Sequence, residues 1–294
     1  MFEGFQEVDF VTRGATIRVR HGGNPGGSPL VLLHGNPLTS ASWHKIAPQL
    51  AERFYVVAPD LRGYGRSSAP EATEDYGNYS FRAMAQDQLE VMGQLGYTSF
   101  HAVGHDRGAR VVHRLCLDAP QAVEQAAVLD ILPTHHVWTN TSKDWAYKSW
   151  HWLFMAQPPD LPEGMMGAVS ARWYMEKKIG KPGIGLRPFS EEALEEYIEC
   201  FDEQTIRGSC NDYRATIGFD FEIDDADYGK RYVESPLLVL WGERSHTGSV
   251  WGDLVPIWQR YARDVRGHGL PCGHYVPEEE PDAVLKHLLE FLDP

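Results

Sequence analysis

Residues 104–108 read Gly104-His105-Asp106-Arg107-Gly108, directly after an apolar run at residues 100–103. The apolar run predicts a short buried strand, and residues 109–117 carry the spacing of a helix, so these five residues form the turn between the two. Glycines two positions before and after Asp106 let such a sharp turn pass without Cβ clashes. The stretch predicts a strained turn that presents the Asp106 carboxylate.

A carboxylate in this turn indicates displacement at a saturated carbon. Attack by Asp106 on an ester or amide would give an anhydride, which is no easier to form than the hydrolysis product itself. Attack on a carbon that carries a halide or an epoxide oxygen gives an alkyl–enzyme ester, whereas serine in the same turn would favour acyl transfer. The expected substrates therefore carry a halide or an epoxide.

Short apolar runs alternate with longer segments of helical periodicity along the chain, which predicts an α/β fold with a mostly parallel sheet and helices on both faces. Residues 7–20 predict a hairpin that is broken at Gly14. The predicted later strands lie at residues 30–33, 55–58, 126–131, 237–241 and near 265, and helices are expected at 81–95 and 282–291.

Residues 133–230 differ in character, because tryptophans, methionines, prolines and helix-like stretches replace the strand pattern. We predict a core made of residues 1–132 and 231–294, with residues 133–230 inserted as a helical cap. A separate helical domain is the alternative. The cap is favoured because strands resume immediately afterwards and need the earlier strands to pair with.

An enzyme of this kind needs a base, an acid that orients the base, and an oxyanion hole. His274, in the turn before the final helix, follows the order in which the nucleophile comes first and the histidine last. Asp130, at the end of a predicted strand, is the preferred acid. The loop after Gly242 is the alternative, although Ser245 stands there where an aspartate is expected.

Two backbone N–H groups are expected to form the oxyanion hole. One belongs to Arg107, after the nucleophile, and the other to Asn36 in the run His34-Gly35-Asn36-Pro37, after the first predicted core strand.

The chain resembles the fluoroacetate dehalogenases, also called haloacetate dehalogenases, a family of α/β-hydrolases. The resemblance extends from the first core strand to the last helix and implies the α/β-hydrolase fold, with a mostly parallel eight-stranded sheet. The runs that carry it are Gly104-His105-Asp106-Arg107-Gly108-Ala109-Arg110, Asp130-Ile131-Leu132-Pro133-Thr134, His151-Trp152, Asp212-Tyr213-Arg214 and Gly273-His274.

Two arginines next to the predicted nucleophile suggest an anionic substrate. Arg107 lies at the positive end of a helix dipole, where a cation is unfavourable, so its side chain is expected to have an anionic partner. Arg110 lies one turn beyond Asp106 on the same face. Together they can bind a substrate carboxylate through charge-assisted hydrogen bonds, and a surface ion pair is the alternative.

The resemblance also implies that His151, Trp152 and Tyr213 donate hydrogen bonds to the departing halide. This chain departs from the family in two places. Asn36 replaces an aromatic residue, and the cap has no tryptophan between Trp173 and Trp241 but a Gly/Pro-rich segment at residues 178–185. The halide preference is therefore left open.

The predicted reaction converts a short 2-haloacid, fluoroacetate or chloroacetate, and water to the 2-hydroxy acid and halide through an ester on Asp106. No cofactor is expected, and no metal site either, since His135 and His136 are adjacent rather than spaced as helical zinc ligands. One alternative is an epoxide hydrolase that uses Tyr213 with Tyr147 or Tyr174. The other is a ligand-binding protein without catalysis.

Composition excludes some partners. The 27 Lys and Arg residues against 41 Asp and Glu residues give a net charge of -14, which argues against nucleic acid and anionic membranes. No apolar run approaches the ~18 residues of a membrane span, and the N-terminus lacks a signal pattern, so a cytoplasmic enzyme is expected. The family suggests a homodimer. Reduced thiols are expected at Cys116, Cys200, Cys210 and Cys272.

Overall fold

A computed structural model describes residues 1–180 and 184–293 and shows one eight-stranded sheet in the order β1-β2-β4-β3-β5-β6-β7-β8. The first two pairings in this order are antiparallel, and all the others are parallel. The predicted α/β fold with a mostly parallel sheet is confirmed. The strands are β1 (Gln6–Val11), β2 (Thr16–Gly23), β3 (Pro29–Leu33), β4 (Tyr55–Pro59), β5 (Phe100–His105), β6 (Val123–Leu129), β7 (Leu237–Gly242) and β8 (Val265–Leu270).

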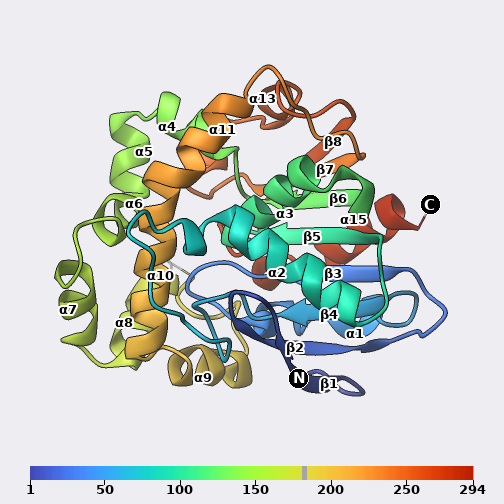
Figure 1. The fold of residues 1–294 in the computed structure, drawn as a ribbon, viewed down its shortest axis with the longest axis horizontal. Coiled ribbons are helices and arrows are strands. Elements are labelled where there is room, and N and C mark those ends of the chain that lie inside the picture. Colours follow the sequence, from blue (N-terminus) through green and yellow to red (C-terminus); the bar gives the residue numbers. More distant parts are fainter. Residues whose placement is uncertain (181–183, 294) are drawn as a thin grey trace.

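Helices cover both faces of the sheet (Figure 1). Alternate residues of β3 show why the sheet is buried on both sides, because Val31 and Leu33 belong to one apolar core while Leu30 and Leu32 belong to the other. The core helices are α1 (Ala47–Leu50), α2 (Phe81–Gln94), α3 (Arg107–Asp118), α12 (Gly248–Trp251), α13 (Val255–Trp258), α14 (Val276–Glu279) and α15 (Pro281–Leu292), with 3-10 turns at Ser40–Trp43, Gly77–Tyr79 and Pro120–Ala122.

The predicted elements lie close to the observed ones. The strand expected at 30–33 is Pro29–Leu33, and the helix expected at 81–95 is Phe81–Gln94. That helix begins after Ser80, whose side chain accepts a hydrogen bond from the Ala83 N–H. The hairpin expected at 7–20 is the antiparallel pair of β1 and β2.

A group of helices lies between β6 and β7 in the sequence. Helix α10, a π-helical segment (Thr216–Asp220) and α11 follow one another as a long rod past the end of the sheet (Figure 1). Of the Gly/Pro-rich segment at 178–185, residues 181–183 lie outside the described ranges. The inserted helices are α4 (Thr134–Thr139), α5 (Lys143–Lys148), α6 (Trp150–Met155), α7 (Leu161–Gly167), α8 (Ala171–Ile179), α9 (Glu191–Glu199), α10 (Glu203–Ala215) and α11 (Phe221–Asp227).

The state of the cysteines and the length of the helices complete the description of the chain. All four cysteines are free and buried, as predicted. Within the described ranges, every helix is too short or too polar to cross a lipid bilayer.

Candidate active site

Asp106 occupies a strained backbone position between β5 and α3. Its φ is 49° and its ψ is -116°, in a region that side-chain-bearing residues rarely adopt. The flanking glycines are needed for close approach: a Cβ on Gly104 would lie 2.5 Å from the Ala109 nitrogen, and one on Gly108 would lie 2.3 Å from the Leu33 oxygen. The predicted sharp turn is present, and it holds the Asp106 side chain at the end of β5.

The loop after β3 lies against the Asp106 carboxylate. The backbone N–H of Asn36 donates a hydrogen bond to Asp106 Oδ2 at 2.9 Å. A Cβ on Gly35 would lie 2.4 Å from the Asp106 Cβ, so only glycine permits this approach. The side-chain oxygen of Asn36 is buried and has no hydrogen-bond partner among the described residues.

His274 connects Asp106 to Asp130. Its Nδ1 lies 2.6 Å from Asp130 Oδ2, and its Nε2 lies 4.0 Å from Asp106 Oδ2. The other oxygen of Asp130 accepts hydrogen bonds from the Gly242 N–H at 3.0 Å and the Ser245 hydroxyl at 2.7 Å. Asp130 is therefore the carboxylate that contacts His274. Ser245, in the loop after Gly242 that was the alternative place for this acid, donates a hydrogen bond to Asp130.

The two carboxylates have pKa values shifted in opposite directions. Burial alone would raise the pKa of Asp106, but the nearby histidines and arginines hold it well below its usual range. Burial raises the pKa of Asp130 to about 6, despite the hydrogen bonds that it accepts. Asp106 is therefore ionised at neutral pH, as a nucleophile must be.

Arg107 is fully buried and has the anionic partner that its position requires. Its Nε donates to Asp212 Oδ2 at 2.7 Å, and its Nη2 donates to the other Asp212 oxygen and to Thr216. Tyr64 donates a further hydrogen bond to Asp212 at 2.6 Å. Burial would lower the pKa of Arg107, but Asp212 raises it, so the guanidinium stays charged. Its Nη1 has no partner among the described residues.

Arg110 lies beside Trp152, with its guanidinium carbon 4.4 Å from the ring centroid. Its Nη1 donates to the Leu132 carbonyl at 2.9 Å and to the Thr134 hydroxyl at 3.2 Å. Burial, and then the charge of Arg107, lower the pKa of Arg110 to about 10, so it remains a cation at neutral pH. No described group accepts a hydrogen bond from its Nε.

The inserted helices bring three aromatic side chains to the same place. His151 and Trp152, on α6, have ring centroids 5.8 and 5.9 Å from that of Tyr213 on α10. Tyr213 also lies under Arg107, whose guanidinium carbon is 4.1 Å from its ring centroid. The Tyr213 hydroxyl is buried and makes no hydrogen bond within the described part of the chain.

The sequence predicted no role for two residues of the site, Asp212 and His246. Asp212 contacts Arg107, although the two residues are 105 positions apart in the sequence. His246 lies on the loop after β7, and its ring centroid is 4.5 Å from that of His274. Ligating atoms of Asp130, His246 and His274 lie within 4.8 Å of one another, so the described residues do contain a group that spacing alone had not suggested. Asp130 and His274 of this group share a hydrogen bond.

A cleft of about 960 Å³ connects this region to solvent. Its lining includes Asn36, His151, His246 and His274, the last of which faces Asp106. A second cleft, of about 1120 Å³, lies between α7, α10 and residues 71–76, and its lining contains none of the predicted site residues. The smaller cleft is therefore the access route relevant to the site.

Comparisons with known proteins show the family to which the chain belongs. Residues 28–167 match the family described as alpha/beta hydrolase fold. The chain is 42% identical to a fluoroacetate dehalogenase from Burkholderia sp over 99% of its length and 95% of the relative. It is 32% identical to a soluble epoxide hydrolase from Corynebacterium sp. (strain C12), over 91% of each. A solved putative alpha/beta hydrolase from Nostoc sp PCC 7120 shares 45% identity and a TM-score of 0.93, covering 100% of this chain and 99% of that one. The chain is thus a hydrolase and belongs to the fluoroacetate dehalogenase (haloacetate dehalogenase) family of α/β-hydrolases.

Proposed function

We propose that this protein hydrolyses the carbon–halogen bond of a short 2-haloacid, such as fluoroacetate or chloroacetate. The observation that carries the proposal is a set of buried donors around Asp106. Arg107 Nη1, Arg110 Nε and the Tyr213 hydroxyl all lack a hydrogen-bond partner among the described residues. Leaving a buried donor unpaired is costly, and two of these groups are cationic, so the set fits a ligand that brings negative charge.

The arginines supply the binding step of this proposal. The free nitrogens of Arg107 and Arg110 bind the carboxylate of the haloacid, while Asp212 holds Arg107 in place from the other side. This orients the halogen-bearing carbon toward Asp106, with the halogen pointing away from the carboxylate.

The displacement step then forms one bond and breaks one. An Asp106 oxygen attacks the carbon, and the carbon–halogen electron pair leaves with the halide. His151, Trp152 and Tyr213 replace the hydration that the halide would have in water, by donating hydrogen bonds to it. The resulting ester joins Asp106 to the hydroxyacid.

Hydrolysis of the ester uses the remaining residues. His274, held in one tautomer by Asp130, removes a proton from a water molecule that attacks the carboxyl carbon of Asp106. The N–H groups of Asn36 and Arg107 stabilise the oxyanion, and the Asn36 N–H already contacts the carboxylate in the resting site. Collapse breaks the bond to the hydroxyacid oxygen, which takes the proton from His274 and leaves as the 2-hydroxy acid. The second proton of the water passes to solvent, which restores the Asp106 carboxylate.

We further propose that the protein is divided into a core and a cap with separate roles. The core consists of residues 1–132 and 231–294 and supplies the nucleophile, the base and the acid, while residues 133–230 form the cap with the halide donors. No cofactor or metal takes part. A homodimer and a cytoplasmic location are the remaining predictions from the sequence.

An epoxide hydrolase is the second candidate, favoured by the relative of that name and by the unpaired Tyr213 hydroxyl. A second tyrosine would be needed to share the epoxide oxygen. Tyr147 is 81% exposed, and Tyr174 stacks on Phe201 with ring centroids 4.6 Å apart. An uncharged epoxide also brings no anion to Arg110, whose described hydrogen bonds go only to a carbonyl and a hydroxyl, so the haloacid is favoured.

Halide release from fluoroacetate, chloroacetate and bromoacetate, measured beside hydrolysis of styrene oxide, tests the proposal. We expect halide from at least one haloacid, no diol from styrene oxide, and loss of halide release in Asp106→Asn. Turnover of styrene oxide without halide release from any haloacid would show instead that the protein is an epoxide hydrolase. Binding of haloacids without turnover would indicate a ligand-binding protein.

A further inference from the structure

The cleft that leads to the site has a charge opposite to that of the protein. Lys148, Lys177, Lys178 and Arg244 belong to its lining, against a single carboxylate, Glu279. The larger cleft is lined by six carboxylates and two arginines, and the whole chain carries 41 acidic against 27 basic residues. The excess of cations in the smaller cleft is therefore local and runs against the composition.

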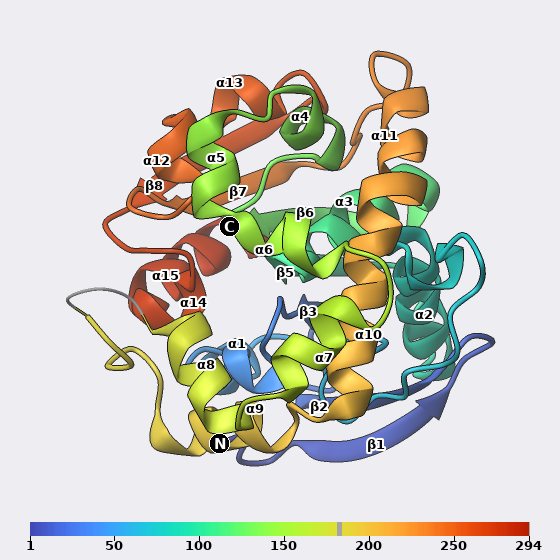
Figure 2. The same ribbon diagram turned by 90° about the vertical axis from the view of Figure 1, so that its left-hand side faces the viewer.

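These cations come from distant parts of the chain. Lys177 and Lys178 lie on α8, and Arg244 follows β7. Helices α5, α8 and α14, which each carry residues of the lining, lie on the same side of the molecule in Figure 2. The cap and the core thus each contribute positive charge to one opening.

The charged side chains that line the cleft differ in whether they already contact another group of the protein. Lys148 contacts the Asp144 carboxylate at 3.0 Å, and Lys178 lies over the Trp150 ring at 5.8 Å. The Glu279 carboxylate accepts hydrogen bonds from two backbone N–H groups, at Gly273 and Tyr275. Lys177 and Arg244 are both exposed, and they are the cations best placed to meet an incoming anion.

The buried arginines cannot perform this task. Arg107 is 0% exposed and Arg110 is 4% exposed, so a solute at the surface touches neither of them. An anion that approaches a protein of net charge -14 is repelled on average. Charges at the opening act over about 10 Å at 0.1 M salt, which covers the approach to the cleft but not the whole surface.

We propose that Lys177 and Arg244 form an anion-capture site at the mouth of the cleft, where a small carboxylate is held before it passes to the buried arginines. The site selects carboxylate-bearing substrates over neutral ones at the stage of association. The identification of the anion as the haloacid rests on the proposed function. Capture of a small organic anion stands on the geometry of the cleft.

The matched comparison uses two double variants with the same loss of two positive charges. Lys177→Gln/Arg244→Gln removes the capture site. Lys286→Gln/Arg266→Gln changes exposed side chains on α15 and β8 that do not line the cleft. Equal melting temperatures of the two variants establish that both are folded.

The measurement is stopped-flow tryptophan fluorescence, with chloroacetate as the anion and chloroacetamide as a neutral molecule of similar size. At low salt, we expect the association rate constant of chloroacetate to fall about 5- to 20-fold in the capture-site variant and less than about 2-fold in the control variant. Added salt should slow chloroacetate association in wild-type protein and have little effect in the capture-site variant. Chloroacetamide should associate equally with all three proteins.

Equal chloroacetate rates in the two double variants would overturn the proposal, because net charge alone would then explain any change. An unchanged rate in both variants would overturn it as well. Charge-dependent association of chloroacetate, without halide release from fluoroacetate, chloroacetate or bromoacetate, would instead leave the capture site standing and refute the proposed dehalogenation.

Discussion

The nitrogens of the Arg107 side chain differ in whether they have a partner in the fold. Nε and Nη2 bind Asp212 and Thr216, whereas Nη1 is buried without a partner among the described residues. Because Asp212 already neutralises much of its charge, Arg107 contributes mainly a fixed donor. Arg110 makes its described hydrogen bonds only to a carbonyl and a hydroxyl, so it contributes the larger share of positive charge to the proposed carboxylate site.

Replacement of Arg110 by lysine should therefore weaken substrate binding more than it slows chemistry. Lysine lacks the planar fork and has no atom equivalent to Nε. Loss of one charge-assisted hydrogen bond, about 1.5–3 kcal/mol, corresponds to a KM for chloroacetate that is about 10- to 100-fold higher, with a smaller change in kcat. Steady-state kinetics check this, with the partly exposed Arg82→Lys as the control. Unchanged KM would remove Arg110 from the carboxylate site.

The opposite pKa shifts of Asp106 and Asp130 predict that the two half-reactions respond differently to pH. The pKa of Asp106 is depressed, so formation of the ester should be insensitive to pH between about pH 5 and pH 8. The pKa of Asp130 is raised to about 6 by burial, so as the pH falls through 6 it gains a proton and no longer stabilises the His274 imidazolium.

Rapid-quench kinetics separate the two steps. Ester hydrolysis should slow as the pH is lowered through about 6, and the ester on Asp106 should accumulate at acid pH. Ester formation that slows in parallel with hydrolysis would mean that both steps depend on the same titration, which contradicts the assignment.

At the scale of the elements, the turn between β5 and α3 depends on how closely α3 approaches the neighbouring strand β3. Gly108 donates its N–H to the His34 carbonyl at 2.9 Å, and the space beside its Cα is occupied by the Leu33 carbonyl. The glycine is thus required by packing of a helix start against a strand end, and that packing also brings Asn36 to Asp106.

The variant Gly108→Ala should lose about 1–3 kcal/mol of the free energy of unfolding, because its Cβ would collide with backbone. Gly93→Ala, on the exposed side of α2 with no atom within 4 Å of the new Cβ, should gain about 0.5–1 kcal/mol. Urea unfolding of both variants checks this. A Gly108→Ala protein as stable as wild type would show that α3 can move away from β3.

The core elements were predictable from the sequence and the inserted ones were not, for a physical reason. A strand buried on both faces, such as β3 or β5, is a continuous apolar run bounded by turn residues. The inserted helices are mostly short, and the π-helical segment Thr216–Asp220 leaves no periodic signal, so only their general helical character could be predicted.

The site divides in the same way. Asp106, Asn36, Asp130 and His274 each follow a strand or precede a helix, so the order of elements placed them on one edge of the sheet. The contact of Asp212 with Arg107 and that of His246 with His274 depend on how two separate loops or helices pack, which no local pattern encodes.

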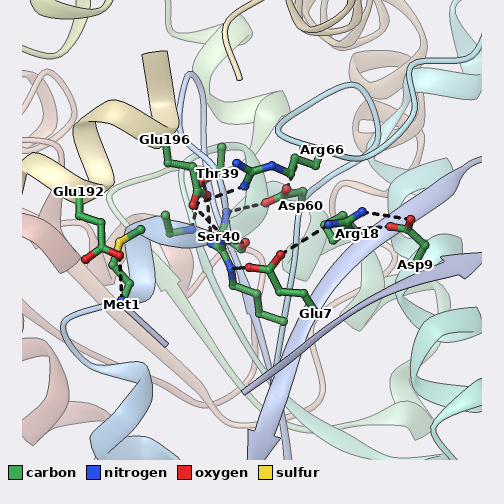
Figure 3. A network of polar contacts seen from close by, with 12 residues as sticks. Met1, Glu7, Asp9, Arg18, Thr39, Ser40, Asp60, Arg66, Glu192 and Glu196 are labelled. Atoms are coloured by element: carbon green, nitrogen blue, oxygen red, sulfur yellow. Dashed lines mark hydrogen bonds and ion pairs between the residues drawn. The ribbon is translucent and has the colours of Figure 1, made fainter. Parts of the chain in front are cut away.

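At the scale of the whole molecule, buried ion pairs connect the inserted helices to the sheet. Glu196 on α9 accepts two hydrogen bonds from Arg20 on β2, at 3.0 and 2.7 Å. It accepts another from Thr39 at 2.6 Å, as Figure 3 shows. Arg107 and Asp212 make a second connection, between α3 and α10. The inserted helices are thus tied to the rest of the fold at two separate places.

The inserted helices and the sheet should consequently unfold together, and Glu196→Gln should cost about 1.5–3 kcal/mol, because the buried Arg20 would lose one charged partner and keep only the Glu7 carboxylate. The control Glu192→Gln, whose side chain is 68% exposed, should cost about 1 kcal/mol or less. Urea unfolding followed by near- and far-ultraviolet circular dichroism checks both. Two separate transitions in the wild-type protein would contradict the coupling.

A single turnover in heavy-oxygen water, with enzyme in excess over chloroacetate, tests the central claim most directly. If Asp106 forms the ester and water then attacks its carboxyl carbon, the peptide that contains Asp106 gains the heavy oxygen, while the first glycolate released carries none. Heavy oxygen in the glycolate and none in the Asp106 peptide would show that water attacks the substrate itself, and would contradict the mechanism proposed for this protein.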